Sequence, residues 1–127
     1  MKKVEAKILV VDDDERALRL MEAMLAPKGY EVILSKNGEE ALDIARLQNP
    51  DVILLDIFMP GMDGYTALTK LKEDEMTANI PVIMVSAVGY NINKKIASMF
   101  GAVEYVTKPV ELVEVLGAID HFLHTSK

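Results

Sequence analysis

Five polar side chains each stand at the end of an apolar stretch of the sequence. They are three carboxylates, one hydroxyl and one ammonium group: Asp12, Asp13, Asp56, Ser86 and Lys108. Clustered carboxylates raise one another's pKa, and a divalent cation relieves their repulsion. Oxygen ligands favour Mg²⁺, with Mn²⁺ or Ca²⁺ as substitutes, over zinc. A carboxylate nucleophile, a metal and a cationic clamp are what phosphoryl transfer to a carboxylate requires, and Asp56 is the expected nucleophile.

These residues can converge only if the apolar stretches are parallel strands of one sheet, whose carboxyl ends share an edge. Short uninterrupted apolar runs are typical of strands buried on both faces. They alternate with stretches that have apolar residues at helical spacing. The pattern predicts an α/β fold: five strand-helix units forming a parallel sheet with helices on both faces. The expected strands are 7–11, 30–35, 51–56, 80–85 and 103–106, and the expected helices are 15–26, 37–49, 65–73, 92–100 and 112–123.

Two local expectations follow from the same pattern. Asp13 or Asp14 is a plausible N-cap for the first helix, because an aspartate side chain accepts hydrogen bonds from the first free N–H groups. The fourth helix has a weaker pattern, and its apolar residues are expected on one face: Ile92, Ile96, Met99 and Phe100.

The size and charge of the chain limit its functions. Its 127 residues suggest a single domain, with a core at about 7–124. The net charge of −6 argues against a nucleic-acid or anionic membrane surface. The chain has no cysteine, and no apolar segment approaches membrane-spanning length. A cytoplasmic location is the default expectation.

Four short segments together resemble a known family. They are Val10-Val11-Asp12-Asp13, Leu54-Leu55-Asp56 with Met59-Pro60-Gly61-Met62-Asp63-Gly64, Val85-Ser86-Ala87 and Thr107-Lys108-Pro109. In order and spacing they are similar to the four motifs of response-regulator receiver domains of two-component signal transduction, over essentially the whole chain. The resemblance implies a doubly wound, flavodoxin-like fold with strand order 2-1-3-4-5. It also implies a cis peptide bond between Lys108 and Pro109.

The resemblance further implies a role for each site residue. Asp56 would accept a phosphoryl group from a phosphohistidine of a histidine kinase or histidine phosphotransferase. Ser86 and Lys108 would hold the phosphoryl oxygens, beside a small residue at Ala87. The resemblance also implies a Mg²⁺ site. Asp13, Asp56 and the backbone carbonyl of Phe58 would bind the ion directly, and Asp12 would bind it through water.

The family works as a switch. Phosphorylation adds about −1.5 to −2 charge. Ser86 would be drawn toward the phosphoryl group, and Tyr105 would rotate into the vacated space. That would bias a surface formed by the fourth helix, fifth strand and last helix, which could bind an effector domain, a downstream protein or a second copy of the chain. No turnover of a substrate is expected beyond self-phosphorylation and self-dephosphorylation.

Three positions depart from the family's usual residues. Ser86 replaces the commoner threonine, which keeps the hydroxyl but loosens its rotamer. Phe58 lies two residues after Asp56, and Val88 lies two residues after Ser86. Both positions flank the approach of an attacking water, so two apolar side chains predict slow self-dephosphorylation.

Other interpretations of the same residues remain open. Asp12 to Asp14 could simply cap a helix. The chain could be a small Mg²⁺-dependent phosphohydrolase of the haloacid dehalogenase type. Such enzymes have a second acidic residue two positions after the nucleophile, and here that position is Phe58. It could also be a receiver-like module that docks or dimerises without phosphate.

Overall fold

The central strand of the sheet is β3, which ends at Asp56. The structure is a computed structural model that describes residues 6–87 and 94–125. Five strands pair in parallel in the order β2-β1-β3-β4-β5. This order and the α/β architecture confirm the predicted fold. The strands are β1 (Lys7–Val11), β2 (Glu31–Ser35), β3 (Val52–Asp56), β4 (Val82–Ser86) and β5 (Glu104–Thr107).

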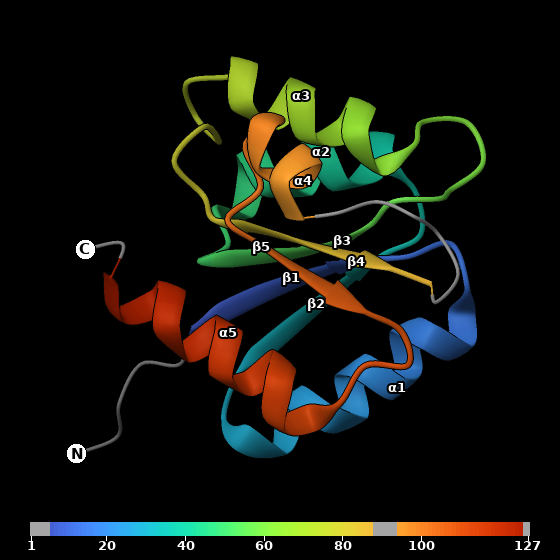
Figure 1. The fold of residues 1–127 in the computed structure, drawn as a ribbon, viewed down its shortest axis with the longest axis vertical. Helices are drawn as coiled ribbons and strands as arrows, with labels where there is room; N and C mark the ends of the chain where they lie inside the picture. Colours follow the sequence, from blue (N-terminus) through green and yellow to red (C-terminus); the bar gives the residue numbers. More distant parts are fainter. Residues whose placement is uncertain (1–5, 88–93, 126–127) are drawn as a thin grey trace.

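Helices cover both faces of this sheet. In Figure 1, α1 and α5 lie on one face, and α2, α3 and α4 lie on the other. A short 3-10 helix, η1, follows α1 directly. The helices are α1 (Glu15–Leu25), η1 (Ala26–Lys28), α2 (Gly38–Gln48), α3 (Gly64–Glu73), α4 (Lys94–Met99) and α5 (Leu112–Thr125).

Alternation along β3 divides the hydrophobic core into two layers. Successive side chains of a strand point to opposite faces. Ile53 and Leu55 pack in the layer beneath α2, α3 and α4. Val52 and Leu54 pack in the layer beneath α1 and α5. All five residues of β3 are buried, so the strand that carries Asp56 is held from both sides.

Polar side chains at three helix starts fix where those helices begin. Asp14 caps α1 by accepting a hydrogen bond from the Arg16 N–H at 3.0 Å. This decides between the two N-cap candidates. Asn37 caps α2 and Asp63 caps α3 through equivalent bonds of 2.7 and 2.8 Å. Each cap supplies an acceptor for an N–H group that the helix itself leaves unpaired.

The large apolar residues of the fourth helix do not form its buried face. Ile96 and Met99 are 40% and 77% exposed, whereas Ala97 is buried. Ile92 lies outside the described residues. The helix has only six residues, and it approaches the sheet on its smallest side chain, which leaves the larger ones outside. Phe100 is also partly exposed, but its ring lies 4.7 Å from the ring of Tyr65.

Element ends differ from the sequence prediction by one or two residues. The first helix stops at Leu25 and gives way to η1. Leu20 of α1 is 59% exposed although it is apolar. β4 includes Ser86 and β5 includes Thr107, because these two residues pair across the sheet beyond the apolar runs. Strand pairing, which the local sequence does not encode, sets these ends.

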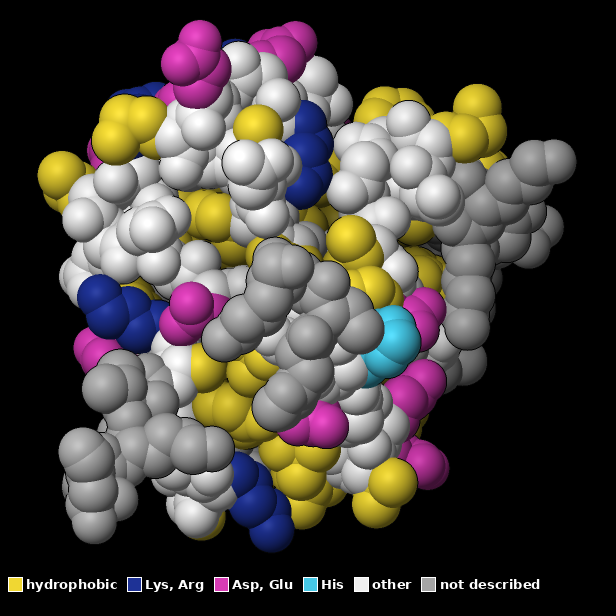
Figure 2. Space-filling view, turned by 90° about the vertical axis from the view of Figure 1, so that its left-hand side faces the viewer, with side chains coloured by type: hydrophobic (Ala, Val, Ile, Leu, Met, Phe, Trp, Pro, Cys, Tyr) yellow, Lys and Arg dark blue, Asp and Glu magenta, His cyan; other side chains and the backbone are white. Residues whose placement is uncertain are grey.

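Two features of the part of the chain that the structure describes bear on membrane or nucleic-acid binding. None of the helices described is long and apolar enough to cross a membrane. On the face drawn in Figure 2, Lys and Arg side chains lie apart from one another among Asp and Glu side chains. A nucleic-acid backbone would need a continuous basic surface, which this face does not present.

Candidate functional site

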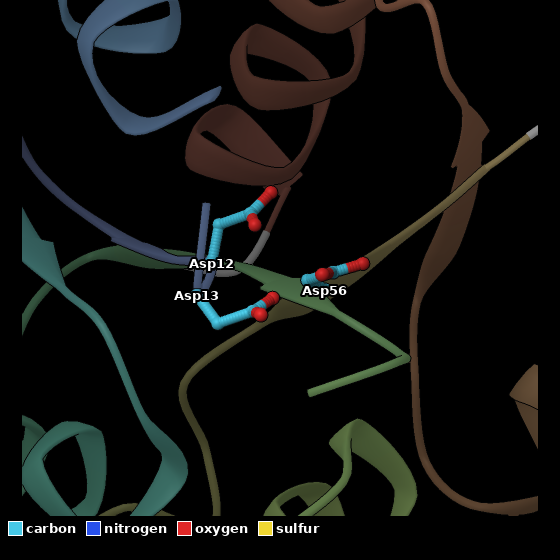
Figure 3. Close-up of side chains that lie close together, drawn as sticks. All are labelled: Asp12, Asp13 and Asp56. Carbon is cyan, nitrogen blue, oxygen red and sulfur yellow. The ribbon is translucent and has the colours of Figure 1, made fainter. Parts of the chain in front are cut away.

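The carboxyl ends of β1 and β3 bring three aspartates together. Asp12 and Asp13 directly follow β1, and Asp56 ends β3. One carboxylate oxygen from each residue lies within 4.8 Å of the other two, and Figure 3 shows the three side chains gathered around one space. Asp12 and Asp56 are only 5% and 6% exposed, while Asp13 is exposed. Solvent therefore reaches the cluster mainly at Asp13.

Lys108 joins this cluster from the end of β5. Its Nζ donates a hydrogen bond to Asp12 Oδ2 at 2.7 Å and lies 3.7 Å from Asp56 Oδ1. Its backbone N–H donates to the Ser86 carbonyl at 2.6 Å, which ties the end of β5 to the end of β4. The Lys108–Pro109 peptide bond is cis, as predicted.

Ser86 and Tyr105 lie on the same face of the sheet. Ser86 pairs with Thr107, and Met84 pairs with Tyr105, so the two residues are diagonal neighbours on adjacent strands. Ser86 is fully buried, and its hydroxyl is 3.5 Å from the Ala87 carbonyl. That distance is at the limit of a hydrogen bond, which leaves the hydroxyl available to a stronger acceptor. Ala87 is half-buried.

The loop after Asp56 is closed tightly onto the strand end. The Gly64 N–H donates to the Ile57 carbonyl at 2.7 Å. A Cβ on Gly64 would collide with the backbone of Asp56 and would lie 2.7 Å from the Ile57 Cα. Gly61 has a φ of +81°, which favours glycine. Phe58 in this loop is 43% exposed, beside the buried Met59. The start of α3 is thus held against the backbone of Asp56.

Comparison with known proteins assigns the chain to a family. The sequence model of the response regulator receiver domain matches residues 8–120. The chain belongs to the response-regulator receiver family. Protein PilH of Pseudomonas aeruginosa is 38% identical over 118 residues, which cover 93% of this chain and 98% of PilH. Response regulator PleD of Caulobacter vibrioides is 41% identical over 116 residues, which cover 91% of this chain but only 26% of PleD.

Solved structures of receiver domains have the same fold. A response regulator from Chloroflexus aurantiacus superposes with a TM-score of 0.89 at 32% identity, covering 94% of this chain and 98% of that one. The receiver domain of a sensor histidine kinase from Pseudomonas aeruginosa superposes with a TM-score of 0.87 at 28% identity, over 95% of this chain and 99% of that one. That structure has a magnesium ion coordinated in its active-site cleft.

The electrostatics of this receiver domain make the charge on Asp56 costly. Burial, followed by the nearby Asp12 and then Asp13, raises the pKa of Asp56 to about 6, although Lys108 lowers it. Burial would lower the pKa of Lys108, but its hydrogen bond to Asp12 and its attraction to Asp56 raise that pKa overall. The lysine remains a cation, and the carboxylates have more negative charge than it neutralises.

The site residues fit a divalent metal ion. Three carboxylate oxygens at close range supply the hard ligands that Mg²⁺ prefers. Burial, and after it the neighbouring Asp12 and Asp13, raise the pKa of Asp56 and make its ionised form costly in the protein alone. Two positive charges next to Asp56 would stabilise its ionised form. The donor set therefore suits the cation that the related histidine-kinase receiver domain holds.

The structure gathers most of the residues singled out from the sequence. The carboxylates of Asp12, Asp13 and Asp56 lie within 4.8 Å of one another, and the Lys108 ammonium lies close to Asp12 and Asp56. Ser86 follows on the neighbouring strand. Val88 lies outside the described residues, so its predicted sheltering of the site stays a prediction.

Sequence reasoning overlooked two features around the site. One is the bond from the Asp14 N–H to Asp12 Oδ1 at 2.9 Å, which orients Asp12. An acidic residue two positions before an N-cap could have suggested it. The other is Tyr65 at the start of α3, which lies against Phe100. Its partner is far away in the chain, so no local pattern identifies the contact.

Proposed function

We propose that this chain is the phosphoacceptor of a two-component system or phosphorelay. Asp56 would take a phosphoryl group from a phosphohistidine on a histidine kinase or histidine phosphotransferase. The observation that carries this proposal is the position of Asp56: it is buried at the end of β3, beside Asp12 and Asp13, with the Lys108 ammonium 3.7 Å away. Membership of the receiver family supports the same role.

In the proposed transfer, an oxygen of Asp56 attacks phosphorus as the bond from phosphorus to the histidine nitrogen breaks. The freed imidazole keeps the electron pair. Lys108 offsets the charge that develops on the phosphoryl oxygens. Ser86 then donates its hydroxyl to one of these oxygens, because its present bond at 3.5 Å is weak. Ala87 leaves room beside the phosphoryl group.

Magnesium is the proposed cofactor, and Mn²⁺ or Ca²⁺ could substitute for it. Asp13, Asp56 and the Phe58 carbonyl would bind the ion directly, and Asp12 would bind it through water. The ion supplies neutralisation of negative charge while a phosphoryl group enters the carboxylate cluster. In the protein alone the Lys108 ammonium donates a hydrogen bond to Asp12 at 2.7 Å. We expect the ammonium to shift from Asp12 toward the phosphoryl group once Asp56 is phosphorylated.

The proposed output is a change of binding surface. Ser86 and Tyr105 lie on one face of the sheet, so a movement of the Ser86 hydroxyl toward phosphate gives Tyr105 space to turn inward. Five large apolar side chains are exposed on α4, in the loop between α4 and β5, and on α5: Ile96, Met99, Phe100, Val103 and Val113. Exposed apolar groups of this size suit a protein partner, which could be an effector domain, a downstream protein or a second copy.

The proposed unit is one receiver domain, residues 1–127 with a core at about 7–124, acting in the cytoplasm. The chain spans almost all of PilH but about a quarter of PleD and half of the transcriptional regulatory protein PhoP of Bacillus subtilis. Relatives thus include both proteins of about this length and longer regulators. In a longer regulator the receiver would act on an effector domain, and in a short protein it would act on a separate downstream protein.

Phosphorylation of Asp56 is directly testable. Incubation with acetyl phosphate and Mg²⁺ should add the mass of one phosphoryl group, and the phosphorylated peptide should contain Asp56. The variant Asp56→Asn should gain nothing, while Asp43→Asn, on the exposed side of α2, should react as the wild type does. An unmodified wild type, or an Asp56→Asn variant that is still labelled, would contradict the proposal. Rapid release of phosphate from many equivalents of a phosphate ester would indicate a hydrolase instead.

A further inference from the structure

Tyr65 has a buried polar group that the described chain does not satisfy. It is the second residue of α3, and its ring lies 4.7 Å from that of Phe100 at an angle of 51°. Its hydroxyl is buried and has no hydrogen-bond partner among the described residues. A phenylalanine would fill the same space without the cost of burying an unpaired hydroxyl. Packing alone therefore does not account for the hydroxyl.

Tyr105 is the neighbouring group that could satisfy it. Tyr65 and Tyr105 both pack against the core layer beneath α2, α3 and α4. The two phenols are close enough that, after burial, Tyr105 is what raises the pKa of Tyr65. A phenol hydroxyl can both donate and accept a hydrogen bond. Two phenols can thus pair once their oxygens come within bonding distance.

The backbone connects this pair to the phosphorylation site from both sides. Tyr65 follows Gly64, whose N–H is bonded to the Ile57 carbonyl at 2.7 Å next to Asp56. Tyr105 shares a sheet face with Ser86. Tyr65 is therefore joined through the Gly64 backbone to the loop after Asp56, and Tyr105 is joined through β4 to Ser86.

We propose that Tyr65 is a positioning residue of the switch: its hydroxyl forms a hydrogen bond with the Tyr105 hydroxyl when Tyr105 turns inward. This inference rests on the proposed function. In the unphosphorylated state the buried Tyr65 hydroxyl has no hydrogen-bond partner within residues 6–87 and 94–125, which destabilises that state. In the phosphorylated state it is paired, which stabilises that one. Both effects favour the inward state, and a bond made in only one of two states shifts their populations.

Reciprocal coupling makes the bond measurable at Asp56. If the inward state binds a phosphoryl group more tightly, removing the Tyr65–Tyr105 bond must weaken binding of a phosphoryl mimic by the same factor. Beryllofluoride with Mg²⁺ is such a mimic. The variants are Tyr65→Phe, Tyr105→Phe and the double variant, with Tyr30→Phe as the control, because Tyr30 packs in the opposite core layer.

Titration of each variant with beryllofluoride at fixed Mg²⁺ is the test. Tyr65→Phe and Tyr105→Phe should each weaken apparent affinity about threefold to tenfold, as expected for one hydrogen bond. The double variant should be no weaker than the weaker single variant, because both changes remove the same bond. Tyr30→Phe should bind as the wild type does.

A spectroscopic readout separates a switch role from simple packing. In protein labelled with 3-fluorotyrosine, the ¹⁹F resonance of Tyr105 should move on beryllofluoride binding, and should move less in Tyr65→Phe. Thermal unfolding should show Tyr65→Phe without ligand to be at least as stable as the wild type.

The possible outcomes have distinct meanings. If Tyr65→Phe binds beryllofluoride with wild-type affinity, or if the two single effects multiply in the double variant, the Tyr65–Tyr105 bond is refuted while phosphorylation of Asp56 stands. If the wild type itself does not bind beryllofluoride, the proposed function fails, and this inference fails with it. The bond would also be refuted if Tyr65→Phe bound beryllofluoride more weakly but the Tyr105 ¹⁹F resonance moved on binding as far as it does in the wild type.

Discussion

The charge of Asp56 is the most informative property of a single residue in this molecule. Burial and two neighbouring aspartates oppose its ionisation, and Lys108 only partly compensates. A carboxylate that is costly in the free protein is stabilised by whatever brings positive charge to it. The same local feature would thus favour the binding of a metal ion, and it lowers the stability of the free protein.

This charge predicts a pH-dependent stability in the absence of metal. Asp56 has a pKa of about 6 in the folded protein, above its ordinary value of 3.8. The folded state therefore holds the proton more tightly, and the free energy of unfolding should fall as pH rises from about 4 to 6, by at most about 3 kcal/mol. Denaturant unfolding in EDTA should show this fall in wild type and in Asp43→Asn but not in Asp56→Asn. Parallel pH profiles for wild type and Asp56→Asn would contradict the assignment.

Phe58 gives a second prediction at the residue scale. It lies two residues after Asp56 and its side chain is partly exposed, so it should hinder an attacking water. Phe58→Asn should shorten the lifetime of the phosphorylated protein by about threefold to tenfold, equivalent to about 1 kcal/mol in the barrier. Decay of ³²P-labelled protein measures this. Leu47→Asn, an exposed apolar position on α2, should have no effect, and an unchanged decay in Phe58→Asn would refute the shielding idea.

At the scale of elements, the junction between β3 and α3 decides how Asp56 is presented. Asp63 caps α3, and Gly64 lets the first turn of the helix lie against the backbone of Asp56 and Ile57. The helix therefore begins at a fixed distance from the strand end. A change at this junction should alter both stability and the chemistry at Asp56.

Gly64→Ala tests this junction. The added Cβ would clash with the backbone of Asp56 and would lie 2.7 Å from the Ile57 Cα, so α3 must move away. We expect a loss of about 1–3 kcal/mol in the free energy of unfolding and slower phosphorylation by acetyl phosphate. Gly117→Ala on α5 is the matched control: nothing lies within 4 Å of its Cβ position, and it should stabilise the protein by up to about 1 kcal/mol. Equal stability of the two variants would show that the contact at Gly64 is not limiting.

At the scale of the whole molecule, the parallel sheet links residues from all parts of the chain into one site. Lys108 reaches Asp12 across 96 positions of sequence. A ligand that binds this site should therefore stabilise the entire fold, because binding to the folded state alone shifts the unfolding equilibrium.

Magnesium should raise the unfolding temperature in a concentration-dependent way. At about 100 times its dissociation constant the ion would contribute about 2.7 kcal/mol. Asp13→Asn should reduce this gain, since it removes a proposed ligand of the ion. Asp13 is the exposed member of the cluster, so its replacement leaves the core intact. Asp43→Asn should keep the gain. Thermal scans at matched ionic strength, with NaCl in place of MgCl₂, measure the specific part; the same rise with sodium would exclude a metal site.

The sequence predicted the fold well because the strands are unbroken apolar runs. Those runs, with helical periodicity between them, indicated a parallel α/β sheet, and the motifs at the strand ends indicated the receiver order. The fourth helix was less predictable. Its apolar residues had helical spacing, yet Ala97 makes the buried contact and Met99 is exposed, because a short helix is oriented by what it packs against rather than by its own pattern.

The sequence by itself determined which chemical groups stand at the strand ends: Asp12, Asp13, Asp56, Ser86 and Lys108. Periodicity places them there, since each follows or ends a buried strand. The tertiary structure alone decided how they meet. It set Lys108 closer to Asp12 than to Asp56, raised the pKa of Asp56 through burial, and placed Tyr65 of α3 beside Phe100. These properties depend on distance and solvent exclusion between residues far apart in the chain, which no local pattern encodes.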